Sequence, residues 1–175
     1  MRKLLESGGI VASVILVAIG IGAITAGLVG RNEVRDELAR EHIVGTPDMK
    51  GIANKPIETG SDARKFASGI RRHALEATGG KTYAEMPRFA GKSGTPTNDE
   101  KQAKVDPKSG KPVDNPERQI WVTETALASA LNTAFFAENV ALFAIVMGIA
   151  LLLTGAGFGV VTLRLLRDRE SAVAA

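Results

Sequence analysis

Two long apolar runs without charge constrain the fold of this chain more than any other feature. The first covers residues 9–30, and the second runs from Val140 to Leu163 with no charged residue before Arg164. At ~1.5 Å per residue, a helix as long as the first run spans ~33 Å, enough to cross the hydrocarbon core of a bilayer. Inside that core every backbone N–H and C=O must pair within the protein, so each run must be helical. The sequence therefore predicts an all-α membrane protein with two antiparallel transmembrane helices.

A cleaved signal peptide is the alternative interpretation of the first run. The basic residues Arg2 and Lys3 fit the start of a signal peptide. The apolar region is too long, however, because signal peptides use about 7–15 apolar residues. The residues before Gly27 are Ile-Thr-Ala, a poor match to the small-x-small cleavage pattern. We therefore expect an uncleaved anchor.

The two runs divide the chain into five segments, and the positive charges near their ends suggest an orientation. Cytoplasmic segments are enriched in Lys and Arg close to the membrane. Both tails are basic, whereas the approach to the second run has only Arg118; Arg31 is a local counter-signal. We expect the following segments: a cytoplasmic N-terminal tail (1–8), a first transmembrane helix (9–30), an extracytoplasmic segment (31–137), a second transmembrane helix (138–163) and a cytoplasmic C-terminal tail (164–175).

The extracytoplasmic segment is predicted to be largely helical and to form a stalk. Residues 31–44 lack Gly and Pro, so the first helix should continue until Gly45. No breaker separates Pro116 from the second run, which predicts one helix over about 117–166. Residues 61–80 have apolar side chains at helical spacing, with Ser61 as the expected N-cap and Gly79-Gly80 as the expected C-terminal signal.

Residues 88–116 form a segment rich in lysine and proline with almost no large apolar side chain. Such a stretch buries too little surface to offset its ordering entropy, so we expect a flexible loop. Acids alternate with the lysines, and residues 31–137 as a whole carry 17 Lys/Arg against 15 Asp/Glu. Because a nucleic-acid surface needs a stripe of positive charge, we expect no nucleic-acid partner.

Small residues recur every four positions in the predicted spans, and this spacing predicts helix-packing faces. Small side chains let two helices approach closely in lipid. We expect the first partner to be the other span of the same chain, with self-association or a protein partner on the unused face. The predicted packing residues are Ala18, Gly22, Ala26 and Gly30 in the first span and Ala144, Gly148, Gly155 and Gly159 in the second.

Glu138 is the one acid at the mouth of a span, and Arg31 ends the other span. Two antiparallel helices would bring these residues to the same depth. We therefore predict an interfacial ion pair between Glu138 and Arg31 or Arg35. An ion relay through the membrane is not expected, because neither apolar run contains an ionisable residue.

The residue inventory disfavours metal and cofactor chemistry. The chain has no Cys and only two His, His42 and His73. A non-haem iron site needs two His and a carboxylate. Glu41 and Glu76 would complete that set, but Arg72 and Arg71 precede His73, and their charge opposes a bound cation. We expect no catalytic residues, no metal and no cofactor.

The segment HALEATGGKTYAEMP at residues 73–87, between a Gly/Ala-rich first span and a second apolar span, resembles a family of small two-span membrane proteins from actinobacteria. Members of this family often carry the label aromatic ring-opening dioxygenase. The resemblance covers most of the chain outside residues 88–116, and it implies the two-span architecture.

Together these features favour a non-catalytic membrane protein that serves as an accessory or scaffold component of the cell envelope, with the lipid bilayer as its first partner. A homo-oligomeric membrane pore is the alternative. An enzyme, as the dioxygenase label suggests, is the third interpretation of the function.

Overall fold

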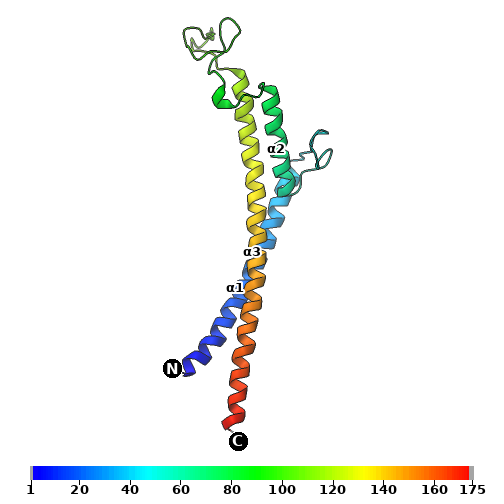
Figure 1. Ribbon diagram of the computed structural model, residues 1–175, viewed down its shortest axis with the longest axis vertical. Coiled ribbons are helices and arrows are strands. Elements are labelled where there is room, and N and C mark those ends of the chain that lie inside the picture. The colour runs from blue at the N-terminus through cyan, green and yellow to red at the C-terminus, as the bar shows by residue number, and fades with distance from the viewer. Residues whose placement is uncertain (1, 174–175) are drawn as a thin grey trace. The chain divides into compact units, whose positions relative to one another are not determined.

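The computed structural model describes residues 2–173, and the side chains of residues 8–167, as a mostly helical protein (Figure 1). Helix α1 covers Arg2–Arg40, α2 covers Gly60–Ala77 and α3 covers Pro116–Val173, with a short 3₁₀ helix, η1, at Tyr83–Glu85. The described residues form no strand, only isolated β-bridges in the connecting segments. The chain divides into two compact units, which we call the hairpin unit (Met1–Glu37 and Phe136–Ala175) and the central unit (Leu38–Phe135).

Two of the helices are long and apolar enough to cross a membrane, as the sequence predicts. α1 and α3 each contain an 18-residue window with a mean hydropathy of 2.4. α3 is one helix over the range expected for it, beginning at Pro116. α1 ends at Arg40, four residues before the expected end at residue 44. The reason is local: His42 adopts a φ of 49°, which a right-handed helix cannot contain.

The predicted tails, 1–8 and 164–175, are helical wherever the structure describes them, because α1 begins at Arg2 and α3 ends at Val173. Met1 and residues 174–175 lie outside the described residues.

In the hairpin unit, α1 and α3 pack antiparallel along a seam of small residues spaced by seven. Ser13, Gly20 and Gly27 of α1 face Gly155, Gly148 and Ala141 of α3, in that order. A Cβ added to Gly20 would lie 2.8 Å from the Gly148 carbonyl oxygen, and one added to Gly148 would lie 2.7 Å from that of Gly20. The Ser13 hydroxyl donates to the Gly155 carbonyl oxygen at 2.6 Å and is buried there, which fixes the register of the two helices.

The predicted packing face of α1 is wrong in its position around the helix. Ala18, Gly22 and Ala26 are exposed, and a Cβ on Gly22 would meet nothing within 4 Å. Of the four predicted residues, only Gly30 lies near α3: a Cβ added to Gly30 would lie 3.9 Å from the Ala141 Cβ. On a helix, a residue four positions further along the chain lies ~40° around the axis from the first residue. A residue seven positions further along lies only ~20° away. Helices that pack along their length therefore repeat every seven residues, not every four.

The predicted packing face of α3 agrees more closely with the structure. Gly148 and Gly155 lie in the seam, and a Cβ on Gly159 would lie 2.8 Å from the Ser13 hydroxyl oxygen. Ala144 is half-buried beside the seam.

In the central unit, α2 packs against α3 through another row of small residues (Figure 1). Gly60, Ala63, Ala67 and Ala74 are buried on α2, and Trp121 is buried on α3. The N-cap of α2 is Thr59, two residues before the expected Ser61, because the Thr59 hydroxyl accepts the Asp62 N–H at 3.2 Å.

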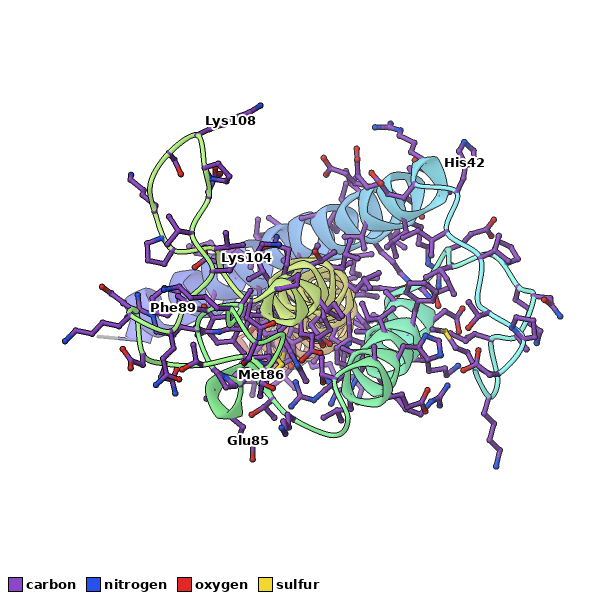
Figure 2. All side chains as sticks on the ribbon, turned by 90° about the horizontal axis from the view of Figure 1, so that it is seen from above. His42, Glu85, Met86, Phe89, Lys104 and Lys108 are labelled. Carbon is purple, nitrogen blue, oxygen red and sulfur yellow. The ribbon has the colours of Figure 1, made fainter. Side chains whose placement is uncertain are left out.

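The Lys/Pro-rich segment 88–116, expected to be a flexible loop, contains turns and isolated β-bridges. Its backbone pairs with itself: the Ala90 N–H donates to Val113 O at 2.9 Å and the Lys104 N–H donates to Ala90 O at 2.7 Å. Phe89 is only 6% exposed, while Figure 2 shows Lys108 at the outer tip of the segment. These hydrogen bonds satisfy backbone polar groups in a segment that has almost no large apolar side chain.

The seam predicts different effects for two glycines only two positions apart. Gly20→Ile should destabilise the hairpin unit by about 1–3 kcal/mol, because the new side chain would overlap the backbone of Gly148. Gly22→Ile, the matched control, should change stability by less than about 0.5 kcal/mol. Two cysteines are introduced, one near the start of α1 and one near the end of α3, and each is labelled with a dye. The measurement is the loss of energy transfer between the two dyes as SDS is titrated into detergent micelles. Equal effects of the two substitutions would contradict the seam.

Candidate functional site

The three residues of the predicted ion pair lie together in the hairpin unit. The Arg31 Nε donates to Glu138 Oε1 at 3.1 Å, and the Arg35 Nε donates to the same oxygen at 2.8 Å. Arg31 and Arg35 are one turn apart on α1, so their side chains lie on the same face and hold one carboxylate between them. The Glu138 side chain is 12% exposed, against 38% and 39% for the arginines.

This arrangement is suited to holding two helices together rather than to transferring protons. Charge-assisted hydrogen bonds are stronger than neutral ones, and burial of Glu138 reduces their screening by water. The exposed sides of the arginines limit the net contribution to that of a partly solvated pair. The cluster follows the last apolar residues of the first run and precedes Val140 of the second, so it marks the end of both runs in the sequence.

The segment 73–87 comprises the last turn of α2, the connection after it and η1, and it covers Trp121 of α3. Gly79 and Gly80 have φ values of 61° and 80°, and the Gly80 N–H donates to Leu75 O at 2.7 Å, which ends the helix. The Trp121 Nε1 donates to Lys81 O at 2.9 Å. Ala74 and Met86 pack against the Trp121 ring, which is 3% exposed.

Beyond the glycines, local hydrogen bonds and ring contacts hold the same segment in place. The Thr82 N–H and hydroxyl both donate to Glu85 Oε2 at 2.7 Å, and the backbone bond is the larger cause of a lowered pKa at Glu85. Arg118 stacks on the Tyr83 ring at 3.9 Å. In Figure 2 the Glu85 side chain points away from the helices. The side chains of Thr78, Thr82 and Glu85 are therefore used in building the turn.

A polar cluster that the sequence did not indicate joins the loop after α1 to α2. Asp48 accepts hydrogen bonds from the Thr46 hydroxyl at 2.5 Å and from Arg72, and lies 2.6 Å from His73 Nε2. The Thr46 hydroxyl, followed by His73, holds the pKa of Asp48 well below its usual value. Next to it Met49 packs on Gly69, where an added Cβ would lie 2.5 Å from the Met49 Cε. No sequence pattern pairs Asp48 with α2, because the contact depends on the path of the loop.

The two histidines of the chain have different surroundings. His73 lies against Asp48, and His42 lies in the turn after α1, where it has a positive φ. Within the part of the chain that the structure describes, no group of three or more His, Cys, Asp or Glu residues could hold a metal ion.

Removing the carboxylate of the Glu138 cluster should weaken the hairpin. Glu138→Gln should destabilise it by about 1–2 kcal/mol, because two arginines then face a neutral group in a partly buried position. The matched control is Glu33→Gln, since Glu33 is exposed on α1, the helix that carries the two arginines. The dye-based SDS titration measures both, and an effect of Glu138→Gln no larger than that of Glu33→Gln would show that the cluster does not stabilise the hairpin.

The chain was also compared with known proteins. No protein-family model, curated protein or solved structure matches it. The resemblance to the actinobacterial two-span family accordingly stays a prediction from the sequence.

Proposed function

We propose that this chain is a non-catalytic integral membrane protein, an accessory or scaffold component of the cell envelope. In this proposal α1 and α3 cross the bilayer as an antiparallel pair. Residues 31–137 then lie outside the cytoplasm as a helical stalk with its loops, and both tails lie in the cytoplasm.

The observation that carries the membrane assignment is the exposure of the apolar helices. Only 11% of the apolar window in α1 and 17% of that in α3 is buried inside the protein. Large side chains such as Phe143 and Leu153 are 65% and 71% exposed. The core helix of a water-soluble protein would hide such residues, and a continuous exposed apolar surface of this kind favours contact with lipid.

The scaffold role is proposed because the carboxylates of the polar clusters have partners within the protein. Glu138 is held by two arginines, Asp48 by Thr46, Arg72 and His73, and Glu85 by the Thr82 backbone and hydroxyl. A catalytic acid or base needs access to a substrate proton. These carboxylates are instead engaged in hydrogen bonds and ion pairs that hold the fold, which favours a structural role for them.

The orientation can be tested directly because the natural chain contains no cysteine. Ser109→Cys, in the Lys/Pro-rich segment, should react in intact cells with a maleimide that cannot cross membranes. Ser171→Cys, in the C-terminal tail, should react only after the cells are opened. Labelling of Ser171→Cys alone in intact cells would reverse the orientation, and labelling of both variants in intact cells would contradict a two-span topology with an internal tail.

A homo-oligomeric pore is the second candidate, favoured by the outward position of Ala18, Gly22 and Ala26. An apolar groove of about 560 Å³ continues this face, lined by Ala26 and Gly30 together with Ala137 and Ala144. Small residues on a lipid-facing surface allow a further helix to approach closely. The native mass of the protein in mild detergent and single-channel recording in liposomes test this candidate. A pore requires an oligomer that conducts and that Gly22→Ile dissociates, whereas a monomer without conductance excludes it.

A further inference from the structure

We propose that the groove between α2 and α3 in the central unit binds a small zwitterion, a molecule of the amino-acid or short-peptide class with one ammonium and one carboxylate group. The inference goes beyond the proposed function. It does not depend on the orientation of the chain in a membrane, because every residue involved belongs to the central unit.

The groove has a volume of about 440 Å³, within the range of ~300–1,000 Å³ typical of small-molecule sites. Ala67 of α2 and Ala128 of α3 contribute only methyl groups to its lining. The rest of the lining is polar or charged: Arg64, Ser68 and Arg71 from α2, and Glu124, Thr125, Ser129 and Asn132 from α3. Since small residues open the space and polar residues surround it, the groove is suited to a polar ligand.

Glu124 is the feature of the groove that needs explanation. It is only 6% exposed, yet its carboxylate has one hydrogen-bond partner, the hydroxyl of the neighbouring Thr125 at 3.2 Å. Among the described residues no Lys, Arg or His forms an ion pair with it. A carboxylate can accept about four hydrogen bonds, and a buried one is costly unless it is paired. A cationic donor in the groove would supply that missing partner.

Two arginines of the same groove also have no carboxylate partner in the described part of the chain. Arg64 lies over the Phe135 ring at 4.7 Å, and Arg71 lies over the Trp121 ring at 5.2 Å. Stacking on a ring orients a guanidinium while leaving its in-plane N–H groups for other acceptors. These two side chains are therefore placed to bind a carboxylate.

The combination of charges selects the ligand class. A purely cationic ligand would meet two arginines, and a purely anionic ligand would meet the buried Glu124. A zwitterion satisfies both, with its ammonium group donating to Glu124 and its carboxylate accepting from the arginines. Ser129 and Asn132, which line the same groove, offer further hydrogen bonds.

The only tryptophan of the chain provides the measurement, because Trp121 lies under Arg71 at the edge of the groove. The full chain in detergent micelles is titrated with alanine and with dialanine, and the fluorescence of Trp121 is followed. We expect a saturable change with at least one of the two. N-acetylation or C-amidation of that probe should weaken binding about tenfold or more, since each removes one charge. Tighter binding of alanine would identify an amino acid as the ligand, and tighter binding of dialanine would identify a peptide.

Two substitutions assign the ends of the ligand. Glu124→Gln should abolish the difference between the free and the acetylated probe. Arg64→Gln should abolish the difference between the free and the amidated probe without disturbing the Trp121 reporter. Arg88→Gln is the matched control, because Arg88 also stacks on an aromatic ring, Phe89, but does not line the groove. Circular dichroism checks that each variant is folded.

The proposal is overturned if neither probe gives a saturable change up to about 10 mM, a concentration at which even weak specific binding is measurable. It is also overturned if blocking either end of the probe leaves binding unchanged, or if Arg88→Gln weakens binding as much as Arg64→Gln. None of these outcomes bears on the labelling experiment, so the membrane topology is tested separately.

Discussion

The close backbone approach of α1 and α3 at Gly20 and Gly148 is the contact on which the hairpin unit depends. Each glycine lies where the other helix leaves no room for a Cβ, so the carbonyl groups and not the side chains set the distance between the helices. In lipid there is little hydrophobic drive between helices, and such close packing is the main source of attraction. The Ser13 hydrogen bond and the Glu138 cluster then fix the register at different points along this seam.

The central unit is built differently, because it must hold α2 against α3 and the loop after α1 against α2. Small residues again bring α2 close, and Trp121 supplies the one large aromatic side chain around which the turn at 78–86 is built. Outside this small core, backbone hydrogen bonds replace apolar burial, as the pairing around Ala90 shows. Side chains that pair elements, such as Asp48 with Arg72 and His73, complete the arrangement.

The charged groups of the two units fall into two kinds, which differ in the partners that they have. Glu138 and Asp48 have partners on another element, and Glu85 caps the short helix η1 through Thr82. Glu124, Arg64 and Arg71 have stacking or single hydroxyl contacts but no ion pair in the described residues, although they line one groove. Groups of the first kind explain how the fold is held, and groups of the second kind indicate where a ligand could bind.

Several features were determined by the sequence alone, because they depend on local composition. Apolar runs of this length must be helical wherever they enter a bilayer, and the absence of a breaker after Pro116 predicts one long helix. The pairing of Glu138 with Arg31 and Arg35 follows from antiparallel helices of known length, so it too could be predicted.

Only the tertiary structure decided which small residues meet. The spacing of Ala18, Gly22 and Ala26 suggested one face of α1, while the partner helix uses Ser13, Gly20 and Gly27. A seven-residue repeat of small residues was present in the sequence of both runs, but choosing it over the four-residue repeat requires the angle at which the helices pack. The contact of Asp48 with α2 and the burial of Glu124 likewise depend on neighbours far away in the sequence, which local patterns do not encode.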